Sequence, residues 1–291
     1  MSRLVPMSRR RSIMTAALVA AAALPLVQCD RVADAPTAPT QADAPVAAPE
    51  KANPVAAPAQ ATLSRSDLIA AAAQAASTYA EGRTPTATDP LIGRSFTVRM
   101  PFGCAGPSIS GAAEAEQGLA RWSWTDDNKT LQLSLTPGDW TDSALIAAPL
   151  GARSAATWEA VEGFWVPRPW MAAETCPSAP TDPLLTVEPT ASPQTLGIAA
   201  VFEADGSRVG RRNGRAYAFT VRPAAGQALV PPVGGYRLVL QGRIVGFPGG
   251  RAIRCKAAGP DQRPVCVAAA RMDRVAFEDA DGAVLTEWRA G

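Results

Sequence analysis

Residues 119–135 read LARWSWTDDNKTLQLSL. Two short apolar runs, 119–124 and 130–135, flank the polar segment Asp126-Asp127-Asn128-Lys129. Trp122 and Trp124 are separated by one residue, so a strand would place both on the same face. Asp and Asn are typical of tight turns, because their side chains bond to the nearby backbone and they tolerate left-handed conformations. The stretch therefore predicts a β-hairpin.

Short apolar runs separated by turn residues continue along the chain. Further strands are predicted at 94–100, 198–204, 207–209, 215–221 and 236–247, with turn signals at Asp205-Gly206 and Asn213-Gly214. Residues 276–284 repeat the turn chemistry of 201–209, around Asp281-Gly282 and Asp205-Gly206. Short strands between regular turns predict a mainly β fold, an antiparallel sandwich or barrel. A second β subdomain beginning near residue 190 stays open.

One helix is expected, over residues 64–81. Ser64 or Ser66 can cap it, Asp67 lies in its first turn and Gly82 follows its end. One face carries small and apolar residues at helical spacing, namely Leu68, Ala72, Ala75, Ala76 and Tyr79. We expect this N-terminal α-helix to dock on its own β domain.

The first 29 residues have the pattern of an export signal. Arg3, Arg9, Arg10 and Arg11 precede an apolar run of 15 residues, 13–27. A helix that spans a bilayer needs about 20 residues. A basic segment before a short apolar run is typical of a secretory signal peptide.

The apolar run ends in Leu26-Val27-Gln28-Cys29, which resembles the lipobox of bacterial lipoproteins. The resemblance implies that Cys29 is lipidated, becomes the mature N-terminus and anchors the protein to a membrane of the cell envelope. Gln28 stands where that class usually has Gly, Ala or Ser. The alternative of a soluble periplasmic or secreted protein therefore stays open.

Residues 30–62 are predicted to be a disordered linker, followed by a β-rich globular domain over 63–291. Between Asp30 and Gln60 there are 11 Ala and 6 Pro and no aromatic residue, a composition that cannot form a packed core. Residues 1–29 hold four of the 28 basic residues and no acidic one, so the mature chain keeps 24 basic and 26 acidic residues. The mature chain therefore has a net charge of −2, and we do not expect it to bind nucleic acid.

Four cysteines remain if Cys29 carries a lipid, and four cysteines allow three pairings. We favour Cys104–Cys176 and Cys255–Cys266, because Gly259-Pro260 and Arg263-Pro264 turn the chain back between the second pair. A CxxC redox motif is missing, so structural bridges in an oxidising compartment are expected.

The chain contains no histidine, which excludes His-based triads, His general bases and His-containing zinc sites. A metal site would need oxygen ligands alone. The segment Asp279-Ala280-Asp281-Gly282 fits a hairpin turn better than a calcium loop. We therefore expect no metal and no cofactor.

Residues 158–170 hold three Trp and one Phe, with acids and an arginine between them. The segment is either a wall of the core or a ligand groove formed by Trp158, Glu162, Trp165, Arg168 and Trp170. We expect Trp165 to be buried and Trp170 to be partly exposed beside Arg168. Glu159 and Glu162 are the candidate acid pair for glycoside hydrolysis, which needs two carboxyls across the scissile bond.

These observations favour an exported envelope lipoprotein whose domain is not an enzyme and binds or braces an envelope protein or glycan. The alternative is a carboxylate-based envelope glycan hydrolase. A groove with two carboxyls at its floor would favour the alternative.

Overall fold

The computed structural model describes residues 60–83, 89–108, 117–125, 129–146, 158–177, 194–203 and 215–289. All of them belong to one compact unit, Ala57–Gly291. Several predictions lie outside these residues: the signal segment with Cys29, most of the linker, the subdomain boundary near 190, the turn at 126–128 and the strand at 207–209.

The described part is mainly β, as the sequence predicts, with one helix and two sheets. The helix is α1 (Arg65–Ala80). The strands are β1 (Ser95–Phe102), β2 (Ala120–Trp124), β3 (Leu131–Leu135), β4 (Gly138–Asp139), β5 (Ala160–Trp165), β6 (Leu196–Phe202), β7 (Tyr217–Val221), β8 (Tyr236–Ile244), β9 (Ile253–Lys256), β10 (Val265–Glu278) and β11 (Val284–Arg289).

The larger sheet has the strand order β1-β8-β10-β6-β5-β4, and β9 and β11 also pair with β10. The β10–β6 pair is parallel, whereas the other pairs of this sheet are antiparallel. The smaller sheet is antiparallel, in the order β2-β3-β7. Its β2–β3 pair, in register from Ala120 opposite Leu135 to Trp124 opposite Leu131, is the predicted hairpin.

Strand β10 organises the larger sheet because its two halves have different neighbours. Its first half lies between β9 and β6, and its second half lies between β8 and β11. The register against β8 shifts between Met272 and Arg274, which makes Asp273 an extra residue. Such a bulge bends a strand and increases its twist. The bend carries β11 toward β7 of the smaller sheet, where Arg215 donates to the carbonyl of Glu287 at 3.0 Å.

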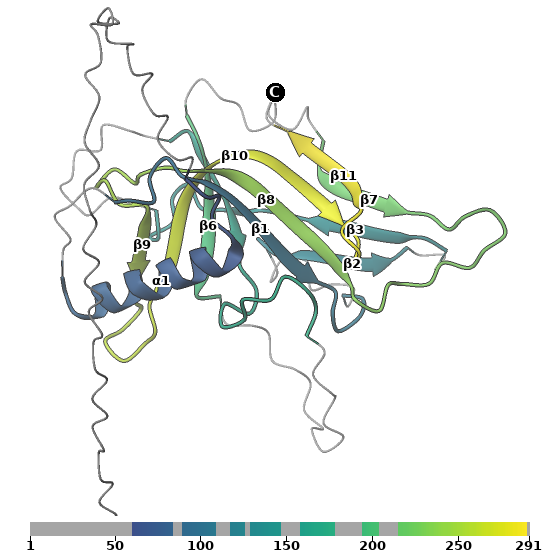
Figure 1. Cartoon of the computed structure of the whole chain (residues 1–291), viewed down its shortest axis with the longest axis horizontal. Helices are drawn as coiled ribbons and strands as arrows, with labels where there is room; N and C mark the ends of the chain where they lie inside the picture. The colour runs from purple at the N-terminus through teal and green to yellow at the C-terminus, as the bar shows by residue number, and fades with distance from the viewer. Residues whose placement is uncertain are drawn as a thin grey trace, which may run out of the picture. The chain divides into compact units, whose positions relative to one another are not determined.

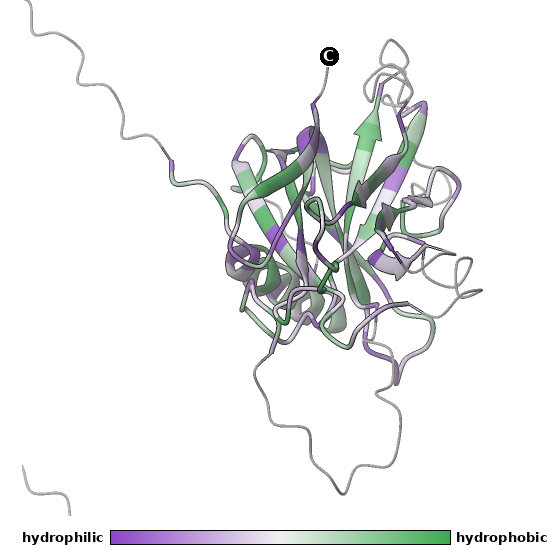
Figure 2. Ribbon diagram, turned by 90° about the vertical axis from the view of Figure 1, so that its right-hand side faces the viewer, coloured by the Kyte–Doolittle hydropathy of each residue, from purple (hydrophilic) through white to green (hydrophobic). Residues whose placement is uncertain are grey.

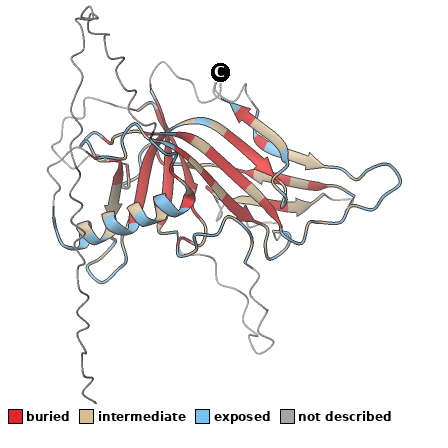
Figure 3. Cartoon of the chain, viewed as in Figure 1, coloured by how far each residue is buried: buried red, intermediate tan, exposed pale blue. Residues whose placement is uncertain are grey.

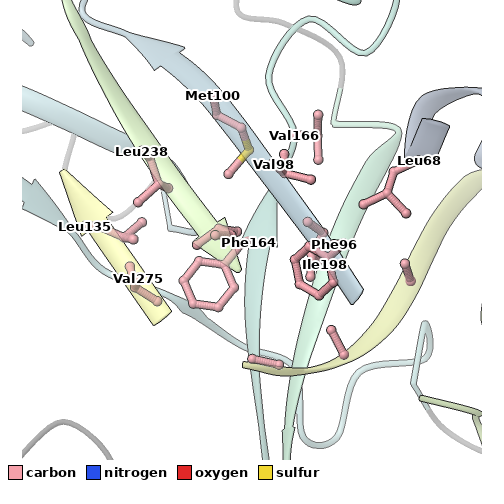
Figure 4. Close-up of a cluster of buried hydrophobic side chains, with 14 of the residues drawn as sticks. Leu68, Phe96, Val98, Met100, Leu135, Phe164, Val166, Ile198, Leu238 and Val275 are labelled. Carbon is pink, nitrogen blue, oxygen red and sulfur yellow. The ribbon is translucent and has the colours of Figure 1, made fainter. Parts of the chain in front are cut away.

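The main core lies on one face of the larger sheet. The smaller sheet covers one end of this face and α1 covers the other (Figure 1). Figure 4 shows Leu68 of α1, Phe96 and Val98 of β1 and Leu135 of β3 as parts of one cluster. The buried positions of β3 alternate along the strand, because one of its faces is covered. Strand β6 is buried throughout, because both of its faces are covered (Figure 3).

Helix α1 begins where the sequence predicts. The Ser64 hydroxyl accepts from the Asp67 amide, and the Asp67 carboxylate accepts from the Ser64 amide, which is a capping box. The helix buries Leu68 and Ala72 and mixes apolar and polar residues around its surface (Figure 2). The docking prediction is thus confirmed, although Tyr79 is not buried: it is 44% exposed, and its hydroxyl accepts from the Ala257 amide at 3.2 Å. None of the described helices is long and apolar enough to cross a membrane.

Candidate functional site

A pocket of about 380 Å³ opens where β1 ends, between the larger and the smaller sheet. It is lined by the end of β1 and the loop after it, the start of β2, and the segment that follows β5. Its lining includes Phe102, Cys104, Arg121, Trp165, Arg168 and Trp170. Aromatic and apolar side chains make up most of the wall, and Arg121 and Arg168 bring two positive charges. Among the described residues of the lining there is no carboxylate.

The loop after β1 turns tightly at Gly103, which has φ of +71°. The Trp122 ring lies so close that a Cβ at Gly103 would overlap it, so only glycine fits this position. The Ser108 amide then donates to the Trp122 carbonyl at 2.8 Å, which holds the loop beside β2. The indole ring and the carbonyl of Trp122, one of the tryptophans of the predicted hairpin, therefore position this wall of the pocket.

A disulfide ties the loop after β1, which lines the pocket, to the end of the segment that follows β5. Cys104, in the loop after β1, is bonded to Cys176 with a Cα–Cα distance of 5.4 Å. Arg168 lies against this bridge, its Nη1 atom 3.8 Å from the sulfur of Cys104. The second bridge, Cys255–Cys266, links opposite residues of β9 and β10, away from the pocket. Both predicted bridges are present.

The buried guanidinium of Arg65 supports the segment 167–171. Arg65 is only 1% exposed, at the first position of α1. Its Nη2 atom donates to the carbonyls of Pro167 at 2.6 Å and Arg168 at 3.3 Å, and its Nε atom to that of Met171 at 3.2 Å. Arg168 itself has φ of +49°, a conformation that non-glycine residues adopt rarely. Arg65 thus holds the segment in a turn that places Arg168 at the pocket.

The electrostatics around Arg65 are unusual. Burial lowers the pKa of Arg65 to about 10, because a charged guanidinium loses its hydration. The nearby carboxylate of Glu174 raises this pKa and the nearby charge of Arg168 lowers it. Arg65 and Arg168 also share a narrow cleft beside the pocket. The two cations next to the pocket wall are therefore accompanied by a carboxylate, that of Glu174.

The structure brings together three of the five residues predicted for a groove. Trp165, Arg168 and Trp170 line the pocket. Trp170 is 58% exposed, as expected for a residue beside Arg168 at the rim. Trp165 is half-buried rather than fully buried, because one side of its ring packs on Trp140, at a centroid distance of 4.6 Å, and the ring also borders the pocket.

Trp158 and Glu162 lie elsewhere. Trp158 packs on Phe247 at a centroid distance of 5.6 Å, in a smaller cluster on the other face of the larger sheet. Glu162 is buried between the sheets, where the Tyr217 hydroxyl donates to it at 3.5 Å. Neighbouring strand positions face opposite sides, so Glu162 faces the main core while Trp165 faces away from it. A segment that alternates between two faces cannot gather all five side chains in one groove.

The acid pair proposed for glycoside hydrolysis is not assembled here. Glu159 is exposed just before β5 begins, whereas Glu162 is buried within the strand, and their spacing of three residues along an extended segment puts them on opposite sides. Neither lines the pocket.

Within the described segments there is no group of three or more Cys, Asp or Glu side chains that could hold a metal ion. Asp279 instead accepts from the amides of Asp281 and Ala283, at 3.0 and 2.8 Å. This is the hairpin turn between β10 and β11 that the sequence predicts.

Arg65, Phe102 and Arg121 were missed at the sequence level. Phe102 and Arg121 reach the pocket from two different strands, and Arg65 reaches the turn beside it from α1, so their positions depend on segments far apart along the chain. Of these three residues, only Arg65 could have been noticed in the sequence. A cation in the first turn of a helix opposes the helix dipole, so a contact elsewhere is expected to stabilise it.

The chain matches no known protein family, no curated protein and no solved structure.

Proposed function

We propose that this chain is an exported envelope protein, anchored by a lipid on Cys29, whose β domain binds a small ligand in the pocket at the end of β1. The pocket carries this proposal. Aromatic walls and a few convergent polar groups are the usual composition of a binding site, and about 380 Å³ lies within the usual range of ligand pockets.

Export is supported by two independent features. The N-terminal segment has basic, apolar and lipobox-like parts in the order that a lipoprotein signal requires. The two disulfides are of a kind that persists in oxidising compartments and is rare in the cytosol.

A binding role is favoured over catalysis by the composition of the site. The chain has no histidine, and of the two carboxylates of the Trp-rich segment, Glu159 is exposed before β5 and Glu162 is buried within it. What the pocket offers is an indole surface, an apolar wall and two guanidinium groups, which suit recognition.

Native mass spectrometry of the full-length protein, released gently from envelopes, tests ligand binding. We expect a small-molecule adduct on the wild type. Ala105→Trp, at an exposed position of the pocket lining, should lose it, whereas Ala224→Trp, at an exposed loop position away from the pocket, should keep it. An adduct on both variants, or on none of the three proteins, would contradict the proposal.

Intact-mass analysis tests the anchor. The mature chain should begin at Cys29 and carry a diacylglyceryl group, and Cys29→Ser should move the protein out of the membrane fraction. An unmodified N-terminus beyond Asp30 in soluble protein would disprove lipidation and leave the pocket proposal standing.

A further inference from the structure

We propose that the pocket at the end of β1 also receives the loop between β7 and β8, residues 222–235, from a second copy of this chain, so that two copies form a reciprocal dimer. This goes beyond the proposed function, which concerns a small ligand. Because the ligand and the loop of a second copy occupy the same pocket, ligand binding and dimer formation exclude each other.

The β7–β8 loop extends beyond the strands that it connects and is largely exposed (Figure 1, Figure 3). Val230 is 77% and Val233 is 101% exposed, the highest values among the large apolar side chains that the structure describes. Residues 223–235 include no charged residue. Water solvates such an apolar projection poorly, so contact with another apolar surface is favourable. The loop is therefore suited to bind a partner surface.

The loop has a defined conformation. The Gln227 amide donates to the Ala224 carbonyl and the Gly235 amide to the Pro232 carbonyl, both at 3.0 Å, so a turn forms on either side of the exposed apolar part. Between the turns, Pro231 and Pro232 fix their own φ angles and favour an extended chain. A segment that is already ordered loses little conformational entropy when it binds.

The loop begins and ends beside the pocket without entering it. Its last residue, Gly235, packs on the pocket wall: a Cβ at this position would lie 2.5 Å from the carbonyl oxygen of Phe102, which lines the pocket. Val230 and Val233 do not line the pocket of their own chain. A two-fold dimer needs both complementary parts on one surface of each copy. The adjacency of loop and pocket meets this requirement, so both contacts can form in one interface.

The pocket also matches the loop chemically. The rings of Trp165 and Trp170 present apolar faces at its wall and rim, and aromatic-lined grooves bind extended proline-containing segments. An indole N–H group only donates hydrogen bonds. Pro231 and Pro232 have no N–H group and keep their carbonyl oxygens, so this part of the loop offers mainly acceptors. Donors on the pocket thus meet acceptors on the loop.

Sedimentation velocity of the mature lipidated protein in a mild detergent, dialysed until its mass shows no adduct, tests the dimer. We expect a reversible dimer with a dissociation constant on the order of 1–100 μM, because small interfaces are weak and transient. The double substitution of Val230→Asp and Val233→Asp should weaken association at least tenfold, and so should Ala105→Trp in the pocket lining. Ala70→Asp, at an exposed position of α1, is the matched control and should leave association unchanged.

Cross-linking between isotopically distinct copies locates the contact. A copy with p-benzoylphenylalanine in place of Val233 is mixed with a ¹⁵N-labelled wild-type copy and irradiated. We expect cross-links from position 233 to the pocket segments 101–108 and 165–170 of the labelled copy. Cross-links to these segments only within one copy would show that the loop closes over its own pocket, and would overturn the proposal.

A wild type that is monomeric at about 0.5 mM would also overturn it, as would a dimer that neither the valine substitutions nor Ala105→Trp weakens. The small-molecule adduct separates the two proposals. An adduct on a protein that never dimerises supports the ligand site and refutes the dimer. A dimer with the expected cross-links, from a protein that carries no adduct in any preparation, supports this inference and refutes the small ligand.

Discussion

Trp140 fits its site because two glycines lie beneath it. A Cβ on Gly163 or on Gly197 would overlap the indole, so the ring lies directly on the backbone of β5 and β6. Trp140 is 7% exposed, Trp165 packs on it and is half-buried, and Trp170 stands at the pocket rim. Three tryptophans that look alike in the sequence therefore differ in what they contribute to stability.

We expect alanine substitutions to rank in that order. Trp140→Ala should lower the free energy of unfolding by about 3–5 kcal/mol, because it leaves a cavity that the sheet cannot refill. Trp165→Ala should cost less, and Trp170→Ala should stay within about 0.5 kcal/mol. Urea unfolding followed by circular dichroism measures all three. A loss for Trp170→Ala as large as that for Trp140→Ala would contradict the assignment of Trp170 to the rim.

Glu287 links two arginines on β10 and β11. Its carboxylate accepts from Arg289 at 2.7 Å and from Arg274 at 2.6 Å, and these hydrogen bonds lower the pKa of Glu287 to about 2. A pKa depressed in the folded state adds stability that is fully present above the unfolded value of about 4.5 and is lost as the pH falls through about 2.

We therefore expect the stability difference between the wild type and Glu287→Gln to shrink as the pH falls from 5 to 2. Urea midpoints at several pH values, at low salt, measure it. A difference that is constant over this range would show that the folded-state pKa of Glu287 is not lowered.

Helix α1 and the turn 167–171 are coupled through Arg65. Arg65→Met keeps the apolar bulk of the side chain but removes donors from three carbonyls, so the free energy of unfolding should fall by about 2–4 kcal/mol. Arg65→Lys retains a charge and should recover part of this loss. Gln74→Met, on the exposed side of the same helix, is the matched control. Equal stability of Arg65→Met and Gln74→Met in urea would exclude the coupling.

The two disulfides close loops of different length. Cys104 and Cys176 are 72 positions apart, and Cys255 and Cys266 are 11 apart within an already paired β9–β10 hairpin. The loop-entropy model assigns them about 4 and about 3 kcal/mol. Replacing both cysteines by serine should therefore destabilise more at Cys104–Cys176, and only that variant should also weaken binding in the pocket. The opposite order of urea midpoints would argue against this loop-length account.

The β domain as a whole should not need the linker that precedes residue 60 for its stability. The compact unit starts at Ala57, and Leu63 is its first buried residue among those described, with backbone bonds to Ser95 and Thr97. A chain of residues 60–291 should therefore melt within about 2 °C of the mature protein, whereas residues 84–291, which lack α1, should melt several degrees lower. Differential scanning calorimetry compares them. A melting temperature of residues 60–291 well below that of the mature protein would show that the linker contributes to stability.

The candidate site was partly visible in the sequence. Trp165, Arg168 and Trp170 are close neighbours in the chain, at the end of β5 and in the turn that follows it, so the density of such residues marked the region. Trp158 and Glu162 come from the same dense stretch, but a strand sends alternate side chains to opposite faces of the sheet. Which face of β5 borders the pocket depends on the distant segments that pack against that strand, and the local sequence does not specify those segments.

The sequence by itself determined the strands of the hairpins, the cap of α1, the turn at Asp279 and the short Cys255–Cys266 bridge, because each depends on backbone preferences and spacings within a short stretch of chain. Only the tertiary structure decided that β10 pairs with four other strands, that Arg65 holds the turn 167–171, and that Arg121 and Arg168 line the same pocket. Most of these contacts join segments that are not neighbours along the chain. They exist because burial of apolar surface brings distant segments together, and that force is not directional along the sequence.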